Sequence, residues 1–396
     1  MNQVCILSTA GDTPAHLVHE VIVRKGHAVR WFNGPDFPSR LELFLAHDGE
    51  GCASGFDQGG ETTAGDCVSV WVRRAVDLSN YPSWYAALAP TEADQARREC
   101  VSLRNNFLSL FAPQALWVNP WHARLMAQNK AVQMQAARHC GFTLPPTLMS
   151  NSPQRIRAFL RAHAGQAIYK TFNPTGLMTR RIAEADLPED EDRIRVSPGI
   201  FQVQVAKAHE LRVTVVGERL FAFRIDSQAT QRGQLDFRNA YDEIGVAAIR
   251  LPDAIEARCK ALCRSLGLVY GALDLIVTPG GDYVFLEVNE SGQFTFLEDM
   301  ATAQGHPAHG IVDAVAELLI QGRADFAWDA SRARLWGADD EVFEAACRRR
   351  TVAMREHLIP PDGEPKHDVL TSRLRLNRQL SARRAARAAD APTHAS

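Results

Sequence analysis

The chain has 396 residues, which is enough for two or three domains with substantial hydrophobic cores. Hydrophobic residues make up 46% and charged residues 23%, as in ordinary globular proteins, and the formal net charge of −2 argues against a nucleic-acid binder. No stretch approaches the roughly 20 apolar residues needed to span a bilayer, so no membrane partner is expected.

Residues 1–120 are expected to form a small α/β domain. The Gly-, Asp- and Thr-rich stretch 49–65 is predicted to be a loop or a weak hairpin. The periodicity elsewhere predicts strands at 4–7, 28–32, 68–74 and 117–118, and helices at 13–25 and 91–110.

The next segment, 121–200, opens with a predicted helix over 124–139. An extended stretch and a helix over 153–164 follow, the helix with Ser152 as its N-cap, and a strand is predicted at 167–171. Residues 171–198 contain Asn-Pro-Thr-Gly and an acidic run, which predicts a mobile loop over a site.

Residues 201–322 are predicted to be mainly strands, interrupted by a helix over 253–267 and closed by a helix over 307–321. Two apolar runs, 270–277 and 283–289, flank a Pro-Gly-Gly-Asp turn as the strands of a hairpin do. The remainder, 323–396, becomes basic and Ala-rich and is expected to be a helical or disordered extension.

Cysteine usage and the first residues bear on the compartment. Eight cysteines are present, with no CxxC pair and no histidine at zinc-like spacing. Cys259 and Cys263 are four apart in a helical pattern and are expected to pack in a core. The chain opens with a strand-like run, Val4 to Leu7, and shows no charged leader before an apolar segment. We therefore expect reduced thiols and a cytoplasmic protein.

The hairpin carries the most informative polar residues. Glu287 and Asn289 are two apart on one strand, so they point to the same face, and Asp274 lies on the preceding strand. Carboxylates buried among apolar residues are costly unless paired or bound to a metal. Hard oxygen ligands of this kind suit Mg²⁺ that bridges phosphates. The alternative is that the two acids are surface charges of an edge strand.

Three cations complete the pattern. Lys130 lies near a helix start, Lys170 on a strand beside the flexible loop, and Arg212 on another strand. Together with the three oxygen donors they would hold a nucleoside triphosphate and its magnesium. No GxxxxGK[ST] motif occurs, which excludes a P-loop, and no GxGxxG or GxSxG motif indicates a dinucleotide fold or a serine nucleophile.

In this order, the motifs resemble the ATP-grasp superfamily, and within it the microviridin-type peptide macrocyclases, or graspetide synthetases. The resemblance covers about residues 1–322, and its most specific piece is Glu287–Phe294, in which Glu290 and Phe294 stand where this branch often has proline and tryptophan. The other matching pieces are Val70–Arg74, Trp117–Pro120, Asn129–Lys130, Gly141, Pro145, Thr147, Phe201–Lys207, Glu210–Val213 and Asp236–Arg238.

The resemblance implies an α/β (α+β) chain with the ATP-grasp fold. A small N-terminal α/β domain (1–120) would precede a central subdomain (121–200) and a C-terminal subdomain (201–322) with the nucleotide and metal site. Lys130, Lys170, Gln202, Val203 and Val205 would bind ATP, with Val203 replacing an acidic hinge residue that is frequent in the family. Asp274, Glu287 and Asn289 would bind Mg²⁺, and Arg212 would face the γ-phosphate and the acceptor carboxylate. Arg224 would either assist Arg212 or be a surface arginine at a strand end.

The implied function is an ATP-dependent carboxylate ligase. It would phosphorylate Asp or Glu side chains of a ribosomally made precursor peptide and form ω-ester or ω-amide macrocycles, releasing ADP and phosphate. One alternative is a ligase that adds an amino acid to a peptide or protein carboxylate, and another is a non-catalytic ATP-binding regulatory protein. Related enzymes are commonly dimers, so a homodimer is expected.

Overall fold

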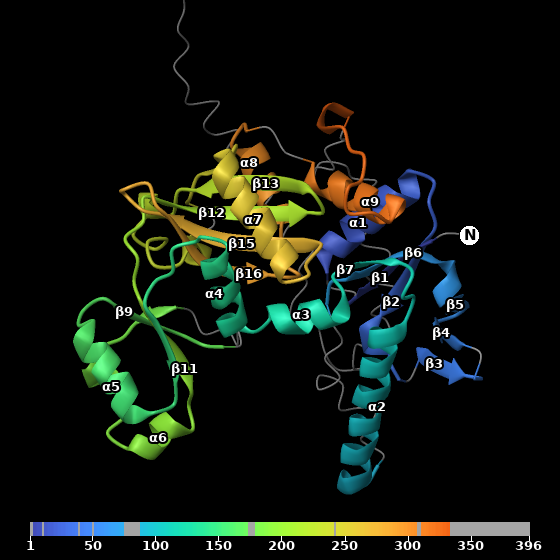
Figure 1. The fold of residues 1–396 in the computed structure, drawn as a ribbon, viewed down its shortest axis with the longest axis horizontal. Coiled ribbons are helices and arrows are strands. Elements are labelled where there is room, and N and C mark those ends of the chain that lie inside the picture. The colour runs from blue at the N-terminus through green and yellow to red at the C-terminus, as the bar shows by residue number, and fades with distance from the viewer. Residues whose placement is uncertain are drawn as a thin grey trace, which may run out of the picture.

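The computed structural model describes residues 3–9, 12–38, 40–49, 51–74, 88–172, 179–240, 243–306 and 310–332. Within these residues, three main sheets and one small sheet account for the strands. The main sheets occupy successive stretches of the chain, and the central one forms a lobe set apart from the first (Figure 1). None of the helices in the described ranges combines the length and the apolar character of a membrane span.

The first sheet is parallel, with the order β2-β1-β6-β7. Its strands are β1 (Gln3–Ser8), β2 (Val29–Asn33), β6 (Cys67–Val72) and β7 (Leu116–Val118), and the helices are α1 (Thr13–Arg24) and α2 (Pro90–Leu110). Alternation along β1 places Val4 and Ile6 in the core that contains α1, and Cys5 and Leu7 in the core that contains the end of α2. The predicted strands and helices of this part are confirmed.

The stretch 49–65 contains a hairpin, as one of the two predictions for it stated. Its strands are β4 (Cys52–Asp57) and β5 (Glu61–Thr63), and they pair with β3 (Glu42–His47), which is not among the predicted elements. Leu43 and Leu45 alternate with the more exposed Phe44, so β3 packs one side against the core around Phe56.

The predicted single helix over 124–139 is wrong. The structure has two helices, α3 (Trp121–Ala127) and α4 (Lys130–His139). Asn129 interrupts them because its side-chain oxygen accepts hydrogen bonds from the backbone N–H groups of Ala131 and Val132, which caps α4. The break makes Lys130 the first residue of α4.

The central sheet is antiparallel, with the order β10-β9-β11-β8. Its strands are β8 (Thr147–Ser150), β9 (Ala167–Lys170), β10 (Arg180–Arg181) and β11 (Gly199–Val203), joined by α5 (Pro153–Ala162) and α6 (Glu191–Arg195). Ser152 caps α5 as predicted, accepting the N–H of Arg155. In the predicted mobile loop, 179–198 contains β10 and α6, and the Asn-Pro-Thr-Gly segment lies outside the described residues.

The third sheet is antiparallel, with the order β14-β13-β12-β15-β16. Its strands are β12 (His209–Val216), β13 (Arg219–Ile225), β14 (Val246–Ile249), β15 (Tyr270–Val277) and β16 (Tyr283–Asn289), and the helices are α7 (Asp253–Ser265), α8 (Thr295–Ala303) and α9 (Ile311–Gln321). One face packs on α4 and α7, where Cys259 and Cys263 are buried as expected. The other face shares a core with α8, α9 and the first sheet.

Helix α9 returns to the N-terminal sheet and lies beside α1 (Figure 1). Lys25 at the end of α1 forms ion pairs with Asp313 at 2.7 Å and Glu317 at 2.6 Å. Beyond α9, Phe326 is buried and the indole of Trp328 donates a hydrogen bond to Asp313, so the chain is packed as far as Trp328. The basic stretch expected near the C-terminus lies outside the described residues.

Candidate active site

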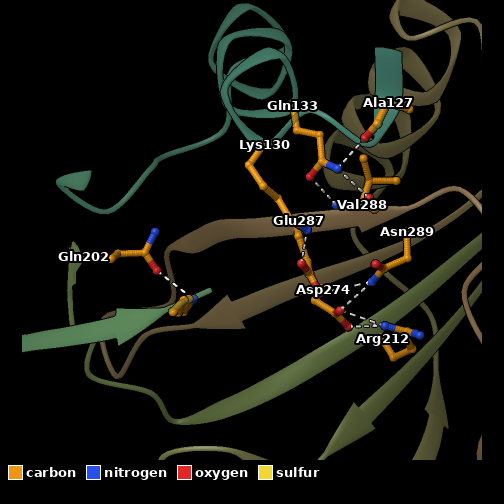
Figure 2. Close-up of polar contacts among 10 residues, drawn as sticks. Ala127, Lys130, Gln133, Gln202, Arg212, Asp274, Glu287, Val288 and Asn289 are labelled. Atoms are coloured by element: carbon orange, nitrogen blue, oxygen red, sulfur yellow. Dashed lines mark hydrogen bonds and ion pairs between the residues drawn. The ribbon is translucent and has the colours of Figure 1, made fainter. Parts of the chain in front are cut away.

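The three predicted oxygen donors come together on one face of the third sheet (Figure 2). Asp274 on β15 lies opposite Glu287 on β16, and Ala272 lies opposite Asn289. The Asn289 amide donates hydrogen bonds to Glu287 Oε1 at 3.1 Å and to Asp274 Oδ2 at 3.3 Å. The i, i+2 spacing and the register of the hairpin therefore place two carboxylates and an amide within contact of one another.

Arg212 joins this group from β12, the neighbour of β15. Its Nη1 donates to both carboxylate oxygens of Asp274, at 2.6 and 2.7 Å, and its Nη2 donates to the carbonyl oxygen of Gln293 at 3.1 Å. Burial opposes the charged form of Arg212, but the Asp274 carboxylate outweighs it and raises the pKa of the guanidinium. Arg212 thus connects Asp274 of the oxygen-donor cluster with the turn that follows β16.

The two carboxylates have opposite electrostatic environments. Burial raises the pKa of Asp274 to about 6, with repulsion from Glu287 adding to it and Arg212 opposing it. Burial also acts against the Glu287 carboxylate, but the ammonium of Lys130 and the Asn289 amide prevail and lower its pKa to about 2. The pKa values of Asp274 and Glu287 differ because the two negative charges lie close together and because each carboxylate has different partners. Glu287 is therefore the anion that is kept ionised.

Lys130 reaches Glu287 from the first turn of α4 and forms an ion pair with it (Figure 2). Gln133, one turn further along α4, fixes the helix on β16: it donates to the Val288 carbonyl at 2.9 Å and accepts the Val288 N–H at 3.1 Å. The pair of hydrogen bonds aligns α4 with the strand that carries Glu287. Sequence analysis missed Gln133, whose signal is a buried amide three residues after Lys130.

Two predicted ATP-binding residues face the site from the central sheet. Lys170 on β9 donates to Gln202 on β11 at 2.8 Å, and Gln202 donates to Thr147 Oγ1 at 2.9 Å. Burial lowers the pKa of the Lys170 ammonium, and nearby Lys130 acts in the same direction, while the charge of Glu287 opposes both. Lys170 therefore lies close enough to the cluster for the charges of Glu287 and Lys130 to act on its pKa.

The remaining predicted residues are placed differently. Val203 ends β11 and Val205 follows it, both half-buried, and the Val203 N–H already donates to the Pro146 carbonyl at 2.9 Å. Arg224 is not brought to the cluster. It lies opposite Leu211, on the other face of the sheet from Arg212, and its exposed side chain pairs with Asp226 at 2.6 Å.

The donor set suits a hard divalent cation. Among the described residues, no three His, Cys, Asp or Glu side chains form a metal cluster, and the third oxygen donor beside Asp274 and Glu287 is the Asn289 amide. Two carboxylates and one amide oxygen, with positions left for water and phosphate, match what Mg²⁺ requires better than a site for a softer metal. The residues present therefore fit the expected ion.

Comparisons with known proteins follow this geometry. Neither the family models nor the curated proteins searched include a match to the sequence. Solved structures do match: the macrocyclase MdnC bound with precursor peptide MdnA from Microcystis aeruginosa MRC has 27% identity and a TM-score of 0.67, covering 80% of this chain and 99% of that one. The chain is an ATP-grasp ligase that is similar to graspetide synthetases over most of its length.

Two further structures agree. The Chryseobacterium gregarium RiPP-associated ATP-grasp ligase, in complex with ADP and a leader and core peptide, has 25% identity and a TM-score of 0.70 over 85% of this chain and all of that one. The macrocyclase MdnB from Microcystis aeruginosa MRC has 26% identity and a TM-score of 0.65 over 81% of this chain and 100% of that one. The ATP-grasp fold predicted for this chain is therefore confirmed.

Proposed function

We propose that this ATP-grasp ligase is a graspetide synthetase, which uses ATP and Mg²⁺ to activate Asp or Glu side chains of a ribosomally made precursor peptide and to close ω-ester or ω-amide rings. The observation that carries the proposal is the meeting of Asp274, Glu287 and Asn289 with cations from two other elements, Lys130 of α4 and Arg212 of β12, in this fold. Such a group neutralises a triphosphate and aligns it, which is most of what phosphoryl transfer asks of a protein.

The reaction needs two bond exchanges. A carboxylate oxygen of the peptide attacks the γ-phosphorus of ATP, the bond to the β-phosphate oxygen breaks, and an acylphosphate and ADP result. A hydroxyl or amine of the same peptide then attacks the carbonyl carbon and loses its proton, and phosphate departs. Activation is necessary because a free carboxylate would have to expel an oxide.

Each residue has a proposed role in this sequence. Asp274, Glu287 and Asn289 would hold Mg²⁺, which when bound neutralises charge on the phosphate oxygens. Lys130 and Lys170 would contact the phosphates, and Arg212 would stabilise the charge of the transferred group. Adenine would lie along Gln202, Val203 and Val205. Arg224 is left out of this assignment because its side chain lies on the far face.

The peptide partner is proposed from the structures that match. MdnC was solved with its precursor peptide, and the Chryseobacterium ligase with a leader and core peptide and ADP.

We further infer a homodimer in the cytoplasm, and the free thiols of the seven described cysteines suit a reducing compartment. The division of the chain at 120, 200 and 322 is likewise a proposal.

The test is a reconstitution. The purified protein is incubated with ATP, Mg²⁺ and the peptide encoded beside its gene that carries Thr, Ser or Lys together with Asp or Glu. We expect ADP release and loss of one water mass per ring. A gain of one amino-acid residue would instead indicate the amino-acid ligase, and AMP as product would contradict the proposal.

A pair of variants ties turnover to the site. Glu287→Ala should abolish ADP release because it removes a metal ligand and the partner of Lys130. Glu218→Ala, at an exposed ion pair with Arg264, removes a carboxylate of the same sheet away from the site and should keep activity. If both variants retain ADP release, the site is misassigned, and if the wild type binds ATP without any turnover, the regulatory alternative stands.

A further inference from the structure

The turn that follows β16, Ser291–Gln293, is held from outside its own sheet. The guanidinium of Arg73 donates from Nη1 to the carbonyl oxygens of Ser291 at 2.5 Å and Gly292 at 3.1 Å. Arg73 lies directly after β6 in the N-terminal sheet, more than two hundred positions away in sequence. Within the sheet, the Tyr270 hydroxyl of β15 also donates to the Gly292 carbonyl oxygen at 2.7 Å. The turn beyond Asn289 is therefore held both by β15 and by a distant part of the chain.

Arg73 is itself fixed in orientation. Its Nε and Nη2 donate to the two carboxylate oxygens of Asp12, at 3.2 and 3.3 Å, and Ser8 Oγ donates to the same carboxylate at 2.6 Å. Both side chains of the pair are 0% exposed. A planar guanidinium held on one edge by a carboxylate presents its remaining N–H groups in a fixed direction.

The turn rests against the proposed metal and phosphate ligands with little clearance. A Cβ added at Gly292 would lie 2.4 Å from the Ala272 Cβ and 3.2 Å from both Arg212 Nη2 and the Asn289 Cβ. The Gln293 carbonyl accepts a hydrogen bond from Arg212. A shift of this turn therefore has to move Arg212, Asn289 or both.

Stability alone does not account for such an arrangement. A buried ion pair contributes little net stability compared with apolar residues of the same volume, because both charges lose their hydration. The Arg73–Asp12 pair instead fixes geometry, because the oriented guanidinium holds the carbonyl groups of Ser291 and Gly292 in a defined position relative to β16. The same geometry serves ligands in metal sites, whose orientation depends on the groups hydrogen-bonded behind them.

We propose that Arg73, oriented by Asp12, is a positioning residue that sets Asn289 and Arg212 for magnesium and phosphate from the N-terminal sheet. The inference rests on the proposed function, since it concerns the same site. It assigns the N-terminal sheet a part in nucleotide binding that does not require any contact with the nucleotide.

The test measures binding of Mg·ADP by calorimetry as Mg²⁺ is varied, beside the thermal melting temperature. Arg73→Lys keeps the charge but offers one ammonium in place of the fork, so it cannot serve Asp12 and both carbonyls together. We expect the Mg²⁺ concentration for half-maximal binding to rise about tenfold or more, as for groups behind metal ligands. Lys25→Met is the matched control.

The control removes the ion pairs of Lys25 with Asp313 and Glu317, which also join the N-terminal sheet to the C-terminal part. It should lower the melting temperature and leave the Mg²⁺ requirement unchanged. If Arg73→Lys behaves in the same way, Arg73 is only structural and the inference is overturned.

A second variant covers the case in which Arg73→Lys does not fold. Asp12→Asn keeps the shape and removes the charge that orients Arg73, so it should raise the Mg²⁺ requirement in the same direction. An unchanged requirement in Asp12→Asn overturns the inference. Failure of the wild type to bind Mg·ADP would instead contradict the proposed function. Failure of the inference and failure of the proposed function can therefore be told apart.

Discussion

The ion pair between Lys130 and Glu287 allows a quantitative test of the site. We consider Lys130→Met and Glu287→Gln, singly and together, as a double-mutant cycle. Lowering the pKa of Glu287 from the usual 4.5 to about 2 corresponds to roughly 3 kcal/mol. The side chains are 23% and 36% exposed, so solvent screening reduces the coupling to about 1–2 kcal/mol.

The assay is urea unfolding of the four proteins at pH 7, without nucleotide or metal. Because the folded-state pKa of Glu287 lies below its unfolded value, its stabilisation is present above about 4.5 and is lost as the pH falls towards about 2. The coupling energy should therefore persist at pH 6 and decline on acidification. A lysine–glutamate pair one turn apart along α7, Lys260 with Glu256, is the control for an ordinary helix pair of similar exposure, and it should couple by about 0.3–0.5 kcal/mol.

Two outcomes would refute this reasoning. A coupling no larger than that of the α7 pair would mean that Lys130 and Glu287 do not interact in the nucleotide-free protein. A coupling that does not change between pH 6 and pH 3 would mean that it does not arise from the Glu287 charge. Either result would also weaken the placement of α4 against β16.

Two further predictions concern the segment after β16. Gly292→Ala should lower both Mg·ADP affinity and stability, because the added Cβ would lie 2.4 Å from the Ala272 Cβ. Gly280→Ala, in the turn between β15 and β16, is the control and should be neutral, because its Cβ would meet no atom nearer than 3.6 Å. Equal Mg·ADP affinities of the two variants by calorimetry would contradict this prediction. Glu298 accepts the Ile311 N–H, and burial raises its pKa from 4.5 to about 7, so the folded state keeps a proton that the unfolded state releases. Stability should fall by up to about 3 kcal/mol as pH rises from 4.5 to 7, and Glu298→Gln should flatten that slope in unfolding measured across pH; a slope like the wild type's would rule out Glu298 as its source.

The sequence was most informative where local pattern and chemistry coincide. The Pro-Gly-Gly-Asp turn and the alternation on either side of it sufficed to predict β15 and β16, and the hairpin register then placed Asp274 opposite Glu287. Strand period and turn chemistry are local properties, so a single sequence reveals them.

Other features depend on information that periodicity does not carry. Asn129 fits a helical pattern, and only its use as a cap separates α3 from α4. Arg224 was expected in the site from the family resemblance, with a surface arginine as the alternative, but in a sheet one position along a strand decides the face. The partners of Arg73 are remote in sequence, and no spacing rule links them.

The return of α9 to the N-terminal sheet bears on how this enzyme can be taken apart. Val18, Val21 and Ile22 of α1 lie in one core with Val315 and Leu319 of α9, so a fragment cut at residue 120 would expose that apolar surface to water. Chimeras between relatives that exchange the first 120 residues should therefore also exchange residues 311–321. The two segments are far apart in sequence, but they pack in one core and have to come from the same parent protein.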